Sequence, residues 1–248
     1  MISCFLQGGL GNQMFQIAST IGFALDNHDT ACFNLNECNT ILQGNPSSYY
    51  KENIFKKICH SEEKNFNIVY NEPKFSYSEI QYYPNLYLIG YFQSEKYFSN
   101  HKNYIQNIFE LPINLVKKPI DNLTSVHIRR GDYVRLNDYH SLCDIEYYKK
   151  SIDLIDGGNF IFFSDDMDWV KNNFIGNNFF YSEYNNEILD LSLMSICDNN
   201  IIANSSFSWW GAYLNKNENK KVIAPSKWFG PKGPTDTQDI IPENWIKI

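Results

Sequence analysis

The sequence predicts an α/β protein with two Rossmann-like, doubly wound domains that face a cleft. Short apolar segments typical of strands alternate with segments whose apolar residues recur every three or four positions, as they do in helices. This alternation runs twice, on either side of residues 112–122, which contain two prolines and show no clear period. Alternating strands and helices form parallel sheets covered on both faces, and ligands bind at the carboxyl ends of their strands.

The first half begins with a strand at residues 2–6, an apolar run that ends in a glycine turn. Apolar residues within positions 14–25 repeat at helical spacing, which predicts a helix that starts at Asn12. Ser94 is placed to cap a second helix that reaches Leu111. Three further strands are predicted at residues 30–34, 67–70 and 86–92.

The second half repeats the pattern with shorter connections. Its predicted strands are residues 125–128, 159–163, 178–181, 200–203 and 221–224. Its predicted helices are residues 144–155, 167–174, 186–197 and 207–214. We therefore expect an N-terminal domain over residues 1–115, a C-terminal domain over residues 116–235, and a tail at 236–248 that packs back on the N-terminal domain.

Composition limits the class of partner. Hydrophobic residues make up 43% of the chain, which is enough for a buried core and excludes a disordered polymer. The formal net charge is −7, and no basic stripe recurs along the chain. Non-specific nucleic-acid binding needs many Lys and Arg on one face, so we exclude it. A nucleotide ligand stays open, since one or two arginines can hold a diphosphate.

The cysteines and the N-terminus predict a cytoplasmic protein. The six cysteines show neither a Cys-x-x-Cys pair nor zinc spacing, so we expect reduced, partly buried thiols and a reducing compartment. They are Cys4, Cys32, Cys38, Cys59, Cys143 and Cys197. The N-terminal apolar run is too short for a signal peptide, and no stretch approaches the roughly 18 apolar residues that span a membrane.

Residues 7–13 (QGGLGNQ) form a glycine-rich turn between the first strand and the first helix. Glycines there let the backbone approach a ligand, and a helix N-terminus favours anions. The segment matches neither the P-loop nor the Gly-x-Gly-x-x-Gly pattern. A ligand-binding loop and a plain tight turn therefore both stay open.

Residues 127–132 (HIRRGD) lie at the carboxyl end of a predicted strand. Side chains alternate along a strand, so His127 and Arg129 share one face and Arg130 takes the other. Arg129 can form a bidentate pair with a diphosphate, worth about 1.5–3 kcal/mol for each charged hydrogen bond. One of the two arginines can instead form a structural ion pair, as Arg130 would with Asp132. The Arg-Gly-Asp tripeptide abuts a buried strand, which argues against adhesion.

Residues 162–166 (FFSDD) also join a strand to a helix. Ser164 or Asp165 can cap that helix. The adjacent carboxylates could chelate a metal, and Asp166 with Asp168 matches an Asp-x-Asp metal pattern. Capping is the simpler role at a helix start, and the arginines already supply positive charge, so we expect no metal.

Residues 198–214 form the last motif, in which a strand ends at Ala203 and a helix follows. The hydroxyls of Ser205 and Ser206, with the free backbone N–H groups of the helix start, can hold phosphate. Gly211 permits close helix packing, and we expect the two tryptophans of this segment to lie in the core.

Together these motifs resemble the α-1,2-fucosyltransferases of glycosyltransferase family 11. The matching segments, in family order, are residues 8–16 (GGLGNQMFQ), 127–133 (HIRRGDY), 163–166 (FSDD), 204–211 (NSSFSWWG) and 222–225 (VIAP), with Trp228 and Phe229. The resemblance implies the two-domain GT-B architecture, with an acceptor-side N-terminal domain and a C-terminal domain that binds a GDP-sugar. It also implies GDP-β-L-fucose as donor, inversion at the anomeric carbon, transfer to O2 of a galactoside, and no metal.

The resemblance further implies roles for single residues. Arg129 would bind the β-phosphate with His127 close by, and Asp198 would contact guanine. The donor-binding residues that it implies are Gly9, Gly11, Asn12, His127, Arg129, Asp165, Asp198, Ser205 and Ser206. The acceptor would be an oligosaccharide or a glycolipid, and a lipid-linked acceptor would bring the protein to a membrane surface. We expect acceptor choice to lie in residues 36–84, which match no family segment.

The expected mechanism is electrostatic. Departing GDP gains negative charge, which Arg129 and the helix start at Ser205 stabilise most in the transition state. Inversion needs a base for the acceptor hydroxyl, and Asp132 is the first candidate, with Asp144 and Glu183 as alternatives. Two other functions stay open: a transferase of another GDP-hexose, of the rhamnose or mannose type, and a non-catalytic sugar-binding or adhesion protein. The last would tolerate Arg129→Ala.

Overall fold

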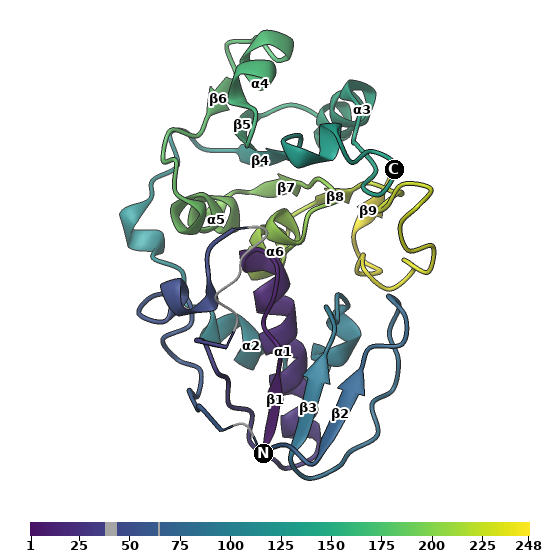
Figure 1. Cartoon of the computed structure of the whole chain (residues 1–248). Coiled ribbons are helices and arrows are strands. Elements are labelled where there is room, and N and C mark those ends of the chain that lie inside the picture. The colour runs from purple at the N-terminus through teal and green to yellow at the C-terminus, as the bar shows by residue number, and fades with distance from the viewer. Residues whose placement is uncertain (38–43, 64) are drawn as a thin grey trace. The chain divides into compact units, whose positions relative to one another are not determined.

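The chain divides into two compact units, each built on a parallel sheet (Figure 1). The structure is a computed structural model that describes residues 1–37, 44–63 and 65–248. The first unit comprises Met1–Glu110 and Asp236–Pro242, and the second comprises Leu111–Thr235 and Glu243–Ile248. Every strand pair in both sheets is parallel within these described residues, which confirms the predicted α/β class.

The first unit holds a three-stranded sheet in the order β1-β3-β2. Its strands are β1 (Ile2–Cys4), β2 (Ile68–Asn71) and β3 (Leu86–Ile89), and its helices are α1 (Leu10–Asp26) and α2 (Lys102–Ile108). The strand predicted at residues 30–34 is reduced to isolated bridges, Ala31 with Ile2 and Phe33 with His60. The helix predicted from Ser94 is broken into two 3-10 turns followed by α2.

The second unit holds a six-stranded sheet in the order β6-β5-β4-β7-β8-β9. Its strands are β4 (Leu123–Ile128), β5 (Asn159–Ser164), β6 (Phe179–Tyr181), β7 (Asn199–Ile201), β8 (Val222–Ala224) and β9 (Ile246–Lys247). Its helices are α3 (Ile145–Ile155), α4 (Met167–Asn173), α5 (Glu187–Ile196) and α6 (Ser206–Leu214). The predicted order of elements is confirmed up to β8, and β9 is an addition.

Helices cover both faces of this second sheet. On one face, Val126 and Phe162 pack with Tyr148 of α3 and Val170 of α4. On the other face, the alternate strand residues Ile161 and Phe163 pack against Leu193 and Met194 of α5. All six residues of β4 are buried, because this strand lies between β5 and β7 and is covered from both sides.

Helix α6 packs closely on α5, as the glycine of its motif predicts. A Cβ at Gly211 would lie 2.9 Å from the side chain of Met194 on α5, so a larger residue would push the helices apart. Trp209 and Trp210 are both 0% exposed, which confirms them as core residues.

The tail departs from the expected packing. Residues 236–242 belong to the first unit, where Asp236 accepts from the Ser76 amide at 2.9 Å. Residues 243–248 belong to the second unit instead, because β9 pairs with β8 and extends the sheet. The unit boundary falls at Glu110 and Leu111, five residues before the expected position at 115 and 116, because the 3-10 helix Ile113–Leu115 packs against α5.

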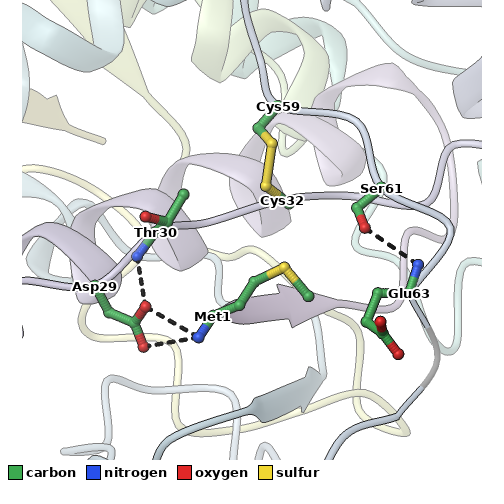
Figure 2. Close-up of a disulfide and its surroundings, with 7 residues drawn as sticks. All are labelled: Met1, Asp29, Thr30, Cys32, Cys59, Ser61 and Glu63. Atoms are coloured by element: carbon green, nitrogen blue, oxygen red, sulfur yellow. Dashed lines mark hydrogen bonds and ion pairs between the residues drawn. A yellow bond between two sulfur atoms is a disulfide. The ribbon is translucent and has the colours of Figure 1, made fainter.

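A disulfide corrects the expectation that all the cysteines are reduced. Cys32 and Cys59 are joined, with Cα atoms 4.6 Å apart (Figure 2). The parallel bridge between Phe33 and His60 brings the two segments together, and the Phe33 amide donates to the Cys59 carbonyl at 2.9 Å. Cys4, Cys143 and Cys197 are free and buried, whereas Cys38 lies outside the described residues.

Among the described residues, none of the helices combines the length and hydropathy that a membrane crossing requires.

Candidate functional site

Arg129 lies directly after β4 and is held by two carboxylates. Its Nη2 lies 2.6 Å from Oδ1 of Asp132, and its Nη1 lies 2.9 Å from Oδ2 of Asp165, which follows β5. A guanidinium carries five N–H donors, so these two ion pairs fix its plane and leave other donors for a ligand. The side chain is 26% exposed, which makes it accessible at the carboxyl end of the sheet.

Arg130 is turned to the other face of the sheet, as alternation predicts. Its Nε lies 3.0 Å from Oδ2 of Asp166, and its guanidinium lies 4.0 Å from the centroid of the Trp169 ring on α4. The structural ion pair expected with Asp132 is therefore made by Arg129, and Arg130 pairs with Asp166 instead. Asp166 is also the cap of α4, since it accepts from the Trp169 amide at 3.3 Å, in place of the expected Ser164 or Asp165.

Asp165 supports the turn that carries the arginines. Its Oδ1 accepts from the Arg130 amide at 2.9 Å. A Cβ at Gly131 would lie 2.4 Å from Asp165 Oδ2, closer than real side chains approach. A side chain at position 131 would therefore displace the Asp165 carboxylate, which is a positioning group for Arg129.

His127 faces the α6 side of the sheet and is 7% exposed. Its ring centroid lies 5.5 Å from that of Phe207 on α6, and its Nδ1 has no hydrogen-bond partner among the described residues. Burial and, to a lesser degree, the charge of Arg129 lower the pKa of His127 to about 3. The imidazole is therefore neutral near pH 7, with one nitrogen able to meet a polar ligand.

The start of α6 lies beside His127, because β7 and β4 are neighbours. Ser205 is the N-cap residue with an extended backbone, and its side chain makes no capping hydrogen bond to the helix. The first N–H groups of a helix lack partners within the helix, and the helix dipole favours negative charge there. Ser205 and Ser206 thus begin a helix of nine residues whose N-terminus suits an anion.

Asn204, predicted only as part of the helix start, is a buried clamp. It is 2% exposed, and its Nδ2 donates to the Ser141 carbonyl at 2.6 Å and to the Trp228 carbonyl at 2.7 Å. Its own carbonyl accepts from the Tyr133 hydroxyl at 3.3 Å. From the sequence, the structural role of Asn204 could have been suspected only from its position between the end of a strand and the helix cap at Ser205.

Asp198 does not join this group, which corrects the guanine-contact assignment. Asn199 pairs with Thr124, so Asp198 lies next to the first residue of β4, whereas Arg129 follows its last. Six residues at about 3.3 Å each separate the two positions by roughly 20 Å. Although burial raises the pKa of Asp198, the amide of Leu123 at 2.8 Å and Lys118 at 2.9 Å lower it overall, so this carboxylate is a structural anchor.

Asp190 is a carboxylate at the same end of the sheet as Arg129. It lies in the first turn of α5, which follows β6, and it accepts a hydrogen bond from the Ser182 hydroxyl. Burial raises the pKa of Asp190, an effect that the Ser182 hydrogen bond partly offsets. This residue was missing from the predicted site because it lies in an apolar helix without a motif.

In the first unit, the glycine-rich turn is held by amide side chains. Gly8 has φ +75°, and a Cβ there would lie 2.4 Å from Nδ2 of Asn12. The side-chain Oδ1 of Asn12 accepts from Nε2 of Gln93 at 2.7 Å, and Nε2 of Gln13 donates to the Gly8 backbone carbonyl at 2.8 Å. At Gly9, the N-cap of α1, an added Cβ would meet nothing within 4 Å among the described residues. The tight turn is thus present, and the ligand role of Gly9, Gly11 and Asn12 stays a prediction.

Comparison with known proteins places the chain in a family. The family profile described as Glycosyl transferase family 11 matches residues 1–248. An alpha-1,2-colitosyltransferase of Escherichia coli is 33% identical, with 98% of this chain and 97% of the relative covered. A galactoside 2-alpha-L-fucosyltransferase of Caenorhabditis elegans is 31% identical, with 100% of this chain and 79% of the relative covered.

The fold is shared with a solved structure. The NodZ alpha-1,6-fucosyltransferase soaked with GDP-fucose superimposes with a TM-score of 0.51 at 12% identity, over 86% of this chain and 91% of NodZ. This likeness confirms the GT-B fold expected from the resemblance. With the match along the whole chain and two relatives above 30% identity, the conclusion is that this chain is a glycosyltransferase and belongs to glycosyltransferase family 11.

Proposed function

We propose that this protein transfers L-fucose from GDP-β-L-fucose to O2 of a galactoside, with inversion at the anomeric carbon. The observation that carries the proposal is the Arg129 guanidinium, fixed by Asp132 and Asp165 at the carboxyl end of β4, two residues after His127, whose ring packs on α6. The fucosyltransferase relative supports the sugar and the galactoside, and the NodZ structure soaked with GDP-fucose supports the nucleotide.

The diphosphate is bound by Arg129 and by the first N–H groups of α6, with Ser205 and Ser206 supplying hydroxyls. Neutral His127 packs against Phe207 of α6, and its buried Nδ1 has no hydrogen-bond partner among the described residues. As the bond from sugar to phosphate breaks, GDP gains negative charge. Donors already fixed in place stabilise that charge without reorganisation.

Asp132 is the general base for the acceptor hydroxyl. Its Oδ1 pairs with Nη2 of Arg129 at 2.6 Å. A diphosphate competes for the same guanidinium, so donor binding weakens this ion pair and frees the carboxylate for proton transfer. Asp144 is a poorer choice because it caps α3 through the Tyr147 amide at 2.8 Å, and Glu183 is exposed in the loop after β6.

Asp190 replaces Asp198 as the candidate for contact with guanine. A carboxylate can accept from both the N1–H and the amino group of guanine. Asp190 lies at the carboxyl end of the sheet, where the diphosphate is held, whereas Asp198 lies at the opposite end. Asp190→Asn is expected to weaken GDP binding more than ADP binding, and Asp198→Asn is expected to affect neither.

The reaction is proposed to need no divalent metal. The remaining N–H donors of Arg129 and the start of α6 supply the positive potential. Around the site, Arg129 and Arg130 carry two positive charges, and Asp132, Asp165 and Asp166 carry three negative ones. The three carboxylates outnumber the two arginines, so metal independence is tested directly by measuring the reaction with excess chelator.

A second donor is favoured by one observation, the 33% identity to an alpha-1,2-colitosyltransferase. The first experiment therefore compares GDP-fucose with GDP-colitose, against a panel of β-galactosides, with excess chelator and free GDP as the readout. Acceptor-dependent GDP release from GDP-fucose supports the proposal. GDP release from GDP-colitose alone would support a glycosyltransferase activity and refute the assignment of fucose as the donor sugar. Rhamnose- and mannose-type GDP-hexoses complete the donor panel, and a lipid-linked galactoside tests for a membrane-borne acceptor.

A further inference from the structure

The second unit contains a pocket of about 610 Å³ formed by two loops. One loop follows the arginine motif after β4, and the other follows β8. Because β4 and β8 are parallel strands of one sheet, both loops leave its carboxyl end. The lining residues that matter here are Asn137, Asp138, Ser141, Lys227 and Phe229. The volume falls within the roughly 300–1,000 Å³ typical of small-molecule sites.

The two loops are joined along their backbones, so the pocket has fixed walls. The Gly230 amide donates to the Tyr139 carbonyl at 2.8 Å, and the Lys232 amide donates to the Asp138 carbonyl at 2.8 Å. An antiparallel bridge joins His140 and Phe229. A Cβ at Gly230 would lie 2.5 Å from the carbonyl oxygen of Asn137, so glycine is needed for this contact.

The pocket is tied to the residues assigned to the donor. Asn204, next to Ser205, holds both loops, through the carbonyl of the lining residue Ser141 and that of Trp228, which lies between the lining residues Lys227 and Phe229. The His140 ring also stacks on Tyr133 at 4.1 Å with an interplanar angle of 3°. Arg129 in turn lies 5.4 Å from the centroid of the Tyr133 ring. The loops that form the pocket are therefore packed against residues that contact or adjoin Arg129 and Ser205.

We infer that this pocket binds a neutral pyranose ring of the acceptor glycan, an inference that rests on the proposed function. Phe229 offers an aromatic ring to the apolar face of a sugar, while Asn137 and Ser141 offer polar groups to its hydroxyls. Asp138 is paired with Lys232 at 2.7 Å, so the lining carries little net negative charge, and Lys227 adds a donor. A single lysine beside a carboxylate does not suit a diphosphate, which separates this pocket from the donor site.

The test measures acceptor KM and GDP affinity for matched variants of the full chain. Phe229→Ala is expected to raise the KM for a β-galactoside by roughly 2- to 13-fold, the loss that an aromatic contact of 0.5–1.5 kcal/mol gives. The Kd for GDP, measured by calorimetry, should be unchanged. Phe229→Tyr keeps the ring and should restore the acceptor KM. Lys227→Ala should also raise it, whereas Lys221→Ala, an exposed lysine outside the lining, should not.

Two outcomes overturn the inference. One is an unchanged acceptor KM in both Phe229→Ala and Lys227→Ala. The other is an equal loss of GDP affinity, which would assign the pocket to the donor. If Phe229→Ala fails to fold by circular dichroism, the comparison of Lys227→Ala with Lys221→Ala decides alone. Failure of the proposed function is seen separately, as absence of GDP release from any GDP-sugar by the wild type. Saturation-transfer NMR with the galactoside then still reports whether the pocket binds a pyranose.

Discussion

The same conservative substitution at two adjacent arginines should have different effects. Arg129→Lys keeps the positive charge but replaces a planar fork with a point charge on a flexible stem. One ammonium cannot reproduce the geometry in which Nη1 meets Asp165 at 2.9 Å while Nη2 meets Asp132 at 2.6 Å. Bidentate contact with the diphosphate should therefore be lost.

The expected size follows from the number of contacts. If lysine keeps one charged hydrogen bond to phosphate where arginine makes two, about 1.5–3 kcal/mol is lost, and the Kd for GDP rises roughly 10- to 150-fold. Thermal stability should change little, because Arg129 is partly exposed.

Arg130→Lys is the matched control. Arg130 pairs with Asp166 and stacks on Trp169 at 4.0 Å, away from the α6 face. Its replacement should weaken the cation–π contact and lower stability by about 0.5–1 kcal/mol, or roughly 1–4 °C in Tm. The Kd for GDP should stay within about threefold of the wild type.

Isothermal calorimetry with GDP and differential scanning calorimetry measure the two quantities separately. The reasoning is refuted if Arg129→Lys binds GDP as tightly as the wild type. It is equally refuted if Arg130→Lys loses GDP affinity to the same degree, since the two faces of β4 would then not have distinct roles.

Three further predictions concern the disulfide, the pH dependence of stability and the turn at Gly131. Cys59→Ser should lower the free energy of unfolding by about 3.5 kcal/mol, the chain-entropy value for a loop of 27 residues, as urea unfolding would measure. Because the pKa of His127 is lowered in the folded state, the neutral imidazole contributes to the free energy of unfolding above pH 6.5, and this contribution is lost as pH falls toward 3. Between pH 6.5 and 4, the free energy of unfolding of the His127→Asn variant should therefore fall less than that of the wild type. Gly131→Ala should displace Asp165 and weaken GDP binding, with little change in Tm.

Features that depend on local pattern and on position along a strand could be predicted from the sequence. Alternation along β4 separates Arg129 from Arg130, and the structure places Arg130 against Trp169 on α4. The period of the apolar residues likewise located the helices of the second unit, because each packs an apolar face on the sheet. These features depend on neighbours within a few residues, which a single sequence displays.

Features that depend on pairing between distant segments could not be predicted in this way. Cys32 and Cys59 meet only because a bridge forms between residues 33 and 60, which no cysteine spacing reveals. Asp198 is a different case, because the strand predicted at residues 200–203 already follows it, and a residue that precedes its strand in a parallel sheet lies at the amino end. The polar side chains that follow a parallel strand are the candidates for ligand contact, and those that precede one serve the fold.

Asp132 provides the last test, because its two proposed roles predict opposite results. If the carboxylate competes with the diphosphate for Arg129, Asp132→Asn removes a competing charge while its carbonyl still accepts from the guanidinium. GDP affinity should then be equal to or tighter than that of the wild type, while kcat falls by roughly 10²- to 10⁴-fold through loss of the base.

Asp165→Asn is the comparison that gives this result its meaning. Asp165 also accepts a hydrogen bond from the Arg130 amide and lies against Gly131. In the Asn variant, a side-chain amide nitrogen facing Arg129 Nη1 would place two hydrogen-bond donors against each other. That variant should lose GDP affinity. If Asp132→Asn loses GDP affinity in the same proportion as turnover, Asp132 is a second positioning group for Arg129, and the base must be sought elsewhere. Opposite shifts in GDP affinity between the two variants would instead show that one carboxylate orients the arginine and the other competes for it.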